Sequence, residues 1–138
     1  MTALAQDAAV VRILIDDQSL REPKGAGFLV TPQHIITCAH VVNDALGRNG
    51  ETVKCPDSAL FFDFPLLPGH PLARAKILHW FPMRENAMFG ELEDIAVLEL
   101  LPGTFLPDEV RPASVVLPHE QSFFDKRVRL CGFPVNAD

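Results

Sequence analysis

The chain has 138 residues and a formal net charge of −6, and 48% of its residues are hydrophobic while 22% are charged. These values are ordinary for one globular domain with a hydrophobic core. No basic patch of the kind that neutralises phosphates is present, which argues against a nucleic-acid-binding protein. No apolar run approaches the roughly 20 residues of a membrane-spanning helix, so we expect no membrane span.

The cysteines indicate the compartment. Cys38, Cys55 and Cys131 are odd in number and lack paired spacing, which argues against a disulfide framework. The first residues do not have the pattern of a signal peptide, since no basic segment precedes the apolar run and Arg12 interrupts that run. Together these features indicate a reducing setting, and we expect a cytoplasmic protein.

The first half of the chain predicts strands and one short helix. Ala8 to Ile15 is apolar and rich in β-branched residues, so it is expected to be a strand. Lys24 to Val30 and His34 to Thr37 form a predicted hairpin around the turn Thr31-Pro32-Gln33, in which Pro32 presets φ. A helix is expected from Val41 to Leu46, and Gly47 ends it.

The second half predicts further strands separated by loops rich in proline and glycine. Thr52 to Lys54 is expected to be a short strand, and Ala59 to Phe64 a firmer one. Leu72 to Trp80 alternates in part, as a strand with one wet face does. Asp94 to Leu100 is a nearly continuous apolar strand opened by an acidic residue, and Arg127 to Pro134 is the last predicted strand.

The predicted hairpin leads into a histidine. Gly25-Ala26-Gly27-Phe28 lies in its first strand, and Thr37-Cys38-Ala39-His40 closes its second. A general base must be held within hydrogen-bond reach of its proton donor, and the end of a strand backed by a core holds it better than a mobile loop. This arrangement resembles the histidine motif of the trypsin/chymotrypsin-like peptidase family, in its intracellular or bacterial type.

A second motif carries the same resemblance. Asp94-Ile95-Ala96-Val97-Leu98 is similar to the family's aspartate motif, Asp-Ile-Ala-x-Leu, with Asp94 at the position of the triad aspartate. The order of His40 followed by Asp94 is the family's order, in which the nucleophilic serine comes last. A carboxylate drawn toward burial by the strand that follows it needs a partner, and we expect that partner to be His40.

The resemblance covers most of residues 8–134 and implies an all-β fold. Residues 8–101 are expected to form the N-terminal six-stranded antiparallel barrel of a chymotrypsin-like double-barrel fold, with a short helix after the histidine. Residues 102–126 are expected to be the crossing segment between two barrels. Residues 127–138 are expected to be the first strand of the second barrel.

The resemblance also implies a function, that of a serine endopeptidase domain with a Ser-His-Asp triad. His40 is then the general base and Asp94 the acid that orients it. Neither Ser114 nor Ser122 has the glycine neighbours of the family's nucleophile, and Cys131 is expected to be a buried structural thiol. The nucleophile, oxyanion hole and substrate pocket are therefore expected in a second barrel outside these residues, and the chain by itself is expected to be inactive.

Other interpretations stay open. A degenerate peptidase fold would act as a non-catalytic protein-interaction or regulatory module, and an unrelated small β-barrel would match the motifs by chance. The expected partners are a protein or peptide substrate and the missing second barrel, and the face meant for that barrel is expected to cause self-association. No Cys-x-x-Cys or His-x-x-x-His pair exists, so no metal and no cofactor are expected. Of the remaining histidines, His34 is expected as a solvated turn residue and His119 on the surface. His70 and His79 have no ligand spacing.

Overall fold

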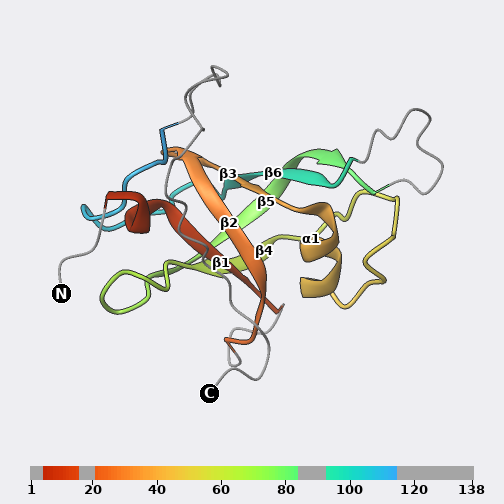
Figure 1. Ribbon diagram of the computed structural model, residues 1–138, viewed down its shortest axis with the longest axis horizontal. Helices are drawn as coiled ribbons and strands as arrows, with labels where there is room; N and C mark the ends of the chain where they lie inside the picture. The colour runs from red at the N-terminus through yellow and green to blue at the C-terminus, as the bar shows by residue number, and fades with distance from the viewer. Residues whose placement is uncertain (1–4, 16–20, 84–92, 115–138) are drawn as a thin grey trace, which may run out of the picture.

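The computed structural model describes residues 5–15, 21–83 and 93–114. Six antiparallel strands close into a barrel in the order β1-β2-β3-β6-β5-β4 (Figure 1). One short helix, α1 (Ala39–Ala45), follows the third strand. The predicted six-stranded antiparallel barrel and its short helix are confirmed, but α1 begins at Ala39 and not at Val41, so His40 lies within the helix and not before it. The strands are β1 (Val10–Leu14), β2 (Pro23–Thr31), β3 (His34–Thr37), β4 (Leu60–Asp63), β5 (Leu72–Phe81) and β6 (Ile95–Leu100).

The barrel closes because β1 pairs with both β2 and β4, which leaves no free edge. Successive side chains of a strand point to opposite faces, so each strand supplies every second residue to the interior. In β6 this places Ala96, Leu98 and Leu100 inside and leaves the two residues between them partly exposed. The two largest buried side chains, Phe62 and Phe64, meet edge to face with their ring centroids 5.7 Å apart.

The predicted first strand begins too early. Ala8 and Ala9 belong to a 3₁₀ helix, η1 (Ala5–Ala9), and β1 starts only at Val10. Pairing with β2 begins where Val10 faces Phe28, whereas the carbonyl of Ala8 accepts a hydrogen bond from the backbone of Arg111. The start of β1 is therefore set by where its pairing with β2 begins, and the apolar pattern of residues 8–15 does not reveal that point.

The short strand predicted at Thr52 to Lys54 is wrong, since this segment has no strand neighbour. Its carbonyls bond to side chains instead. The amide of Asn43 donates to the carbonyl of Thr52 at 3.1 Å, and the indole of Trp80 donates to the carbonyl of Val53 at 2.8 Å. These bonds satisfy the backbone groups that would otherwise need a strand.

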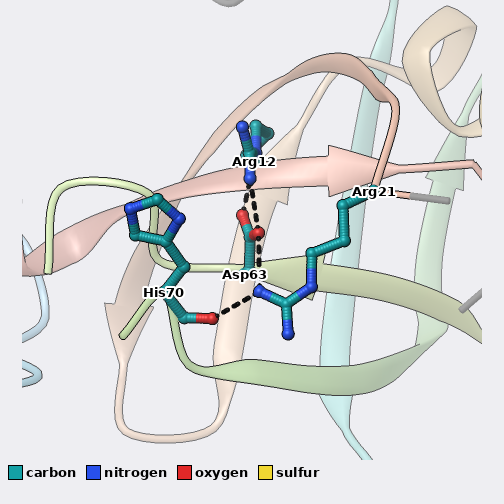
Figure 2. Close-up of polar contacts among 4 residues, drawn as sticks. All are labelled: Arg12, Arg21, Asp63 and His70. Atoms are coloured by element: carbon teal, nitrogen blue, oxygen red, sulfur yellow. Dashed lines mark hydrogen bonds and ion pairs between the residues drawn. The ribbon is translucent and has the colours of Figure 1, made fainter. Parts of the chain in front are cut away.

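An ion pair with a fully buried carboxylate ties β1 to β4. Arg12 and Asp63 face each other across the two strands, and the guanidinium binds both carboxylate oxygens, at 3.0 and 2.6 Å (Figure 2). Asp63 is fully buried, and Arg21 approaches the same carboxylate at 3.5 Å while donating to the carbonyl of His70. The residue that interrupts the apolar first strand is therefore half of a cross-strand pair.

Residues 102–114 return to the barrel after β6. Val110 is buried in the core, and the backbone N–H of Ala113 donates to the carbonyl of Leu29 at 2.7 Å. The later part of the expected crossing segment and the strand predicted at Arg127 to Pro134 lie outside the described residues. Within the described residues, no helix has the length and apolar character needed to cross a membrane.

Candidate functional site: a histidine–aspartate pair at the barrel end

Strand pairing brings His40 and Asp94 to the same end of the barrel. Thr37 at the end of β3 faces Ala96 near the start of β6, because the two strands are antiparallel. His40 lies shortly after Thr37, in the first turn of α1. Asp94 directly precedes β6. Figure 1 shows α1 at the end of the barrel away from the β2–β3 hairpin. Two residues that are 54 positions apart in sequence thus become neighbours.

Asp94 holds His40 at two points. Its Oδ2 lies 2.5 Å from Nδ1 of the imidazole, and its Oδ1 accepts a hydrogen bond from the backbone N–H of His40 at 2.9 Å. A carboxylate only accepts hydrogen bonds, so the proton between the two side chains belongs on Nδ1 of the neutral ring. Nε2 then carries the free lone pair. The bond to the backbone N–H fixes the carboxylate, and the carboxylate in turn orients the ring through Nδ1.

The same carboxylate caps the helix. Cys38 is the residue before α1, and its side chain makes no capping hydrogen bond. The first N–H groups of a helix have no partner within the helix, and Asp94 supplies one from a distant strand. The bond to the backbone therefore has a structural role whether or not the imidazole handles a proton.

The side chains of the residues that follow His40 anchor α1 to the barrel and to the next loop. Val42 and Asn43 are fully buried, and Val41 packs closely against Gly25 of β2. The amide of Asn43 donates to the carbonyls of Gly50 and Thr52, both at 3.1 Å, which ties the helix to the loop that follows it. The imidazole is thus carried on a helix, α1, that is attached both to β2 and to the loop that follows the helix.

Exposure differs between the two partners. The side chain of His40 is 42% exposed, whereas that of Asp94 is 20% exposed. The ring is therefore accessible to a reacting group, while the carboxylate behind it is largely shielded from water. An imidazole so placed can accept a proton at Nε2, and the neighbouring carboxylate would stabilise the resulting positive charge.

Cys38 is the neighbour that the sequence did not single out as a site residue. One ligand atom each from Cys38, His40 and Asp94 lies within 4.8 Å of the other two. Partial burial of the thiol raises the pKa of Cys38, and the negative charge of Asp94 raises it further. The thiol is therefore protonated at neutral pH. Its spacing of two from His40 was visible in the sequence, but its nearness to Asp94 depends on the pairing of β3 with β6.

Of the serine and cysteine candidates for the nucleophile, the structure describes only Ser114. Ser114 is exposed, and no hydrogen bond joins it to His40 among the described residues. Ser122 and Cys131 lie outside the described residues.

The other histidines lie elsewhere. His34, expected as a solvated turn residue, is only partly exposed, because its Nδ1 lies 2.6 Å from the hydroxyl of Thr31 and its Nε2 lies 3.5 Å from the carboxylate of Glu99. His70 lies in a loop with a φ of 44°, and His79 is exposed on β5, while His119 is outside the described residues.

A hollow of about 690 Å³ opens at the opposite end of β3 and β6. Gln33 of the hairpin turn, Leu100 at the end of β6 and Arg111 are among the residues that line it. It is therefore separate from the pair formed by His40 and Asp94.

The chain was compared with protein-family models and with curated proteins. Neither a protein-family model nor a curated protein matches this chain. The site is consequently defined by its own geometry: a half-exposed imidazole held by a shielded carboxylate at the mouth of a closed barrel.

Proposed function

We propose that this chain is the N-terminal barrel of a trypsin/chymotrypsin-like serine endopeptidase domain of the intracellular or bacterial type. The observation that carries the proposal is the two-point hold of Asp94 on His40, at Nδ1 and at the backbone N–H. The motifs around both residues and their order in the chain support the same family. A closed six-stranded antiparallel barrel agrees with it.

In this proposal, His40 handles the proton of the reaction. Its Nε2 takes the proton from the serine hydroxyl as the oxygen attacks the peptide carbonyl, and later returns it to the leaving amine as the peptide C–N bond breaks. In the second half of the reaction, His40 takes a proton from the water that attacks the acyl-enzyme and returns it to the serine oxygen as the ester C–O bond breaks. Asp94 keeps the proton on Nδ1 and stabilises the imidazolium that forms in each step.

The nucleophile in this proposal is supplied by the second barrel of the same protein. Ser114 lacks glycine neighbours that would form an oxyanion hole, and it is not joined to His40. The 138-residue chain alone is therefore expected not to hydrolyse peptides, since base and orienting acid without a nucleophile do not complete the reaction.

A fluorophosphonate probe, which labels an activated serine, tests the proposal on the natural protein extended beyond Asp138. Labelling is expected, and His40→Ala or Asp94→Asn should slow it by about 10³-fold or more, as loss of a triad member does. His79→Ala is the matched control, because His79 is an exposed histidine on β5. An extended protein that the probe does not label contradicts the enzymatic function.

The alternative is a non-catalytic interaction module, and one observation favours it. Phe28, Ile36 and Ile95 are 51%, 39% and 48% exposed on the outer face of β2, β3 and β6. Phe28 of β2 faces Ile36 of β3 directly across the two strands. We refer to Phe28, Ile36 and Ile95 together as the apolar stripe. An extended protein that is not labelled but binds another protein through this stripe would establish the alternative.

A further inference from the structure

The thiol of Cys38 lies beside the His40–Asp94 pair and has no part in the proton transfer proposed above. Thiolate sulfur, imidazole nitrogen and carboxylate oxygen are the ligand types that Zn²⁺ takes in proteins. Among the residues that the structure describes, these three form the one group in which three such ligand atoms lie within 4.8 Å of one another. The cluster is thus distinguished by both its chemistry and its spacing.

The distances between the three ligand atoms would allow them to coordinate one ion after small movements of the side chains. With bonds of about 2.0–2.3 Å in a tetrahedral zinc site, neighbouring ligand atoms lie roughly 3.4–3.6 Å apart. Nδ1 of His40 and Oδ2 of Asp94 are 2.5 Å apart, so this pair must open by roughly 1 Å. The sulfur is within 4.8 Å of a ring nitrogen of His40 and of a carboxylate oxygen of Asp94, so it must approach these atoms by no more than about 1.4 Å. Rotations about side-chain bonds supply movements of this size.

The cluster is open to solvent on one side and fixed on the other. Cys38 is exposed and the imidazole is 42% exposed, so an ion has a path to the ligands. Cys38 and His40 are held by β3 and α1, and Asp94 by the start of β6. Three protein ligands leave a fourth position for water.

The geometry points to a Zn²⁺-binding site made by Cys38 Sγ, a ring nitrogen of His40 and a carboxylate oxygen of Asp94. Paired Cys and His spacings in the sequence, on which the expectation of no metal is based, would not reveal such a site, because its ligands come from two distant segments. Binding displaces the thiol proton to solvent and forms the Zn–S bond, with no change of oxidation state.

A bound ion would disable His40 as a base, and this consequence rests on the proposed function. Coordination through Nδ1 breaks the hydrogen bond to Asp94 and moves the ring proton to Nε2, which then has no lone pair for the reaction. Coordination through Nε2 occupies that lone pair directly. Either mode makes zinc an inhibitor of the proposed peptidase.

Titration of the reduced, metal-free 138-residue chain with Co²⁺ and then Zn²⁺ tests the site directly. One equivalent of Co²⁺ should produce tetrahedral d–d absorption and a thiolate-to-cobalt charge-transfer band, and Zn²⁺ should abolish both. Cys38→Ser should remove the charge-transfer band and weaken Zn²⁺ binding at least about tenfold, since loss of a group that only hydrogen-bonds to a metal ligand already costs about that much. Cys55→Ser is the matched control, because Cys55 is also an exposed free thiol but belongs to no such cluster in the described chain.

Two results overturn the site: a charge-transfer band that survives Cys38→Ser, or a chain that shows neither a spectral change nor heat on addition of either ion. Asp94→Asn is a second variant that should weaken Zn²⁺ binding without removing the thiol. Circular dichroism of each variant checks that the barrel is folded.

Labelling of the extended protein separates this inference from the proposed function. Zn²⁺ should slow fluorophosphonate labelling of the wild type, and the ratio of rates with and without zinc should approach one in Cys38→Ser. An extended protein that is not labelled at all overturns the peptidase, while the titration still decides the metal site.

Discussion

Gly25 of β2 lies so close to Val41 of α1 that a Cβ at position 25 would come within 2.5 Å of Val41 Cγ2. Gly27 is similarly constrained, since a Cβ added at this position would lie 2.8 Å from the carbonyl oxygen of Ile36. The two glycines of the Gly-Ala-Gly-Phe segment therefore allow a helix and a strand to approach β2. The first contact sets the position of α1, and with it that of His40.

Gly25→Ala is expected to destabilise the chain by about 1–3 kcal/mol, because the added methyl group overpacks a buried contact with a stiff valine. Urea unfolding measures the effect. Val41→Ala removes the two methyl groups that the new Cβ would meet, so the double variant should lose less stability than the sum of the single variants. Additive losses would show that Gly25 does not act through Val41.

Asp63→Ala is expected to cost about 3–5 kcal/mol, because it leaves the guanidinium of Arg12, 18% exposed, without its partner. Arg21→Ala is the control. Its contact with the same carboxylate is 3.5 Å long and its side chain is 41% exposed, so the loss should be below about 1 kcal/mol. Equal losses in the two variants, measured by urea unfolding, would contradict the assignment of the stabilising pair to Arg12 and Asp63.

Asp94→Asn is expected to lower the pKa of Cys38, because the negative charge of Asp94 is one of the two causes that raise it. The thiolate fraction then begins to rise at a lower pH. In metal-free buffer, the pH profile of alkylation at Cys38, followed by mass spectrometry, should move to lower pH. Cys55 is an internal control, since Asp94 is not among the charges that act on its pKa. A profile for Cys38 that does not move would rule out the electrostatic effect of Asp94.

The hydrogen bond between the two side chains predicts one tautomer of the His40 ring. At alkaline pH, where histidine rings are neutral, ¹⁵N NMR should show the proton on Nδ1 and none on Nε2. Asp94→Asn replaces an obligate acceptor by an amide that also donates, so a mixture of tautomers should appear. An Nε2–H tautomer in the wild type would contradict the arrangement.

The apolar stripe of Phe28, Ile36 and Ile95 predicts self-association of the chain. Sedimentation should show a mass that rises with concentration, and Phe28→Ser with Ile36→Ser should return the chain to a monomer. Val53→Ser is the matched control, because Val53 is 58% exposed in a loop outside the stripe. A wild type that is monomeric and monodisperse at all concentrations contradicts the prediction.

The sequence by itself determined most of the strands and the short helix. The hairpin of β2 and β3, the end of α1 near Gly47, and β6 after Asp94 were all predicted closely. These features depend on turn residues and on apolar periodicity, which are properties of neighbours in the chain. The predicted strand at Thr52 to Lys54 failed because side chains outside the segment, among them the distant Trp80, bind its carbonyls in place of a partner strand.

Only the tertiary structure decided which distant residues meet. The closure of β1 on β4 pairs Arg12 with Asp63, and the pairing of β3 with β6 places Cys38 beside His40 and Asp94. Neither contact follows from local pattern, because strand order and register are set by how the whole barrel buries its apolar faces. A residue type at one position shows what chemistry is available there, whereas closure of the sheet determines which other groups that chemistry can reach.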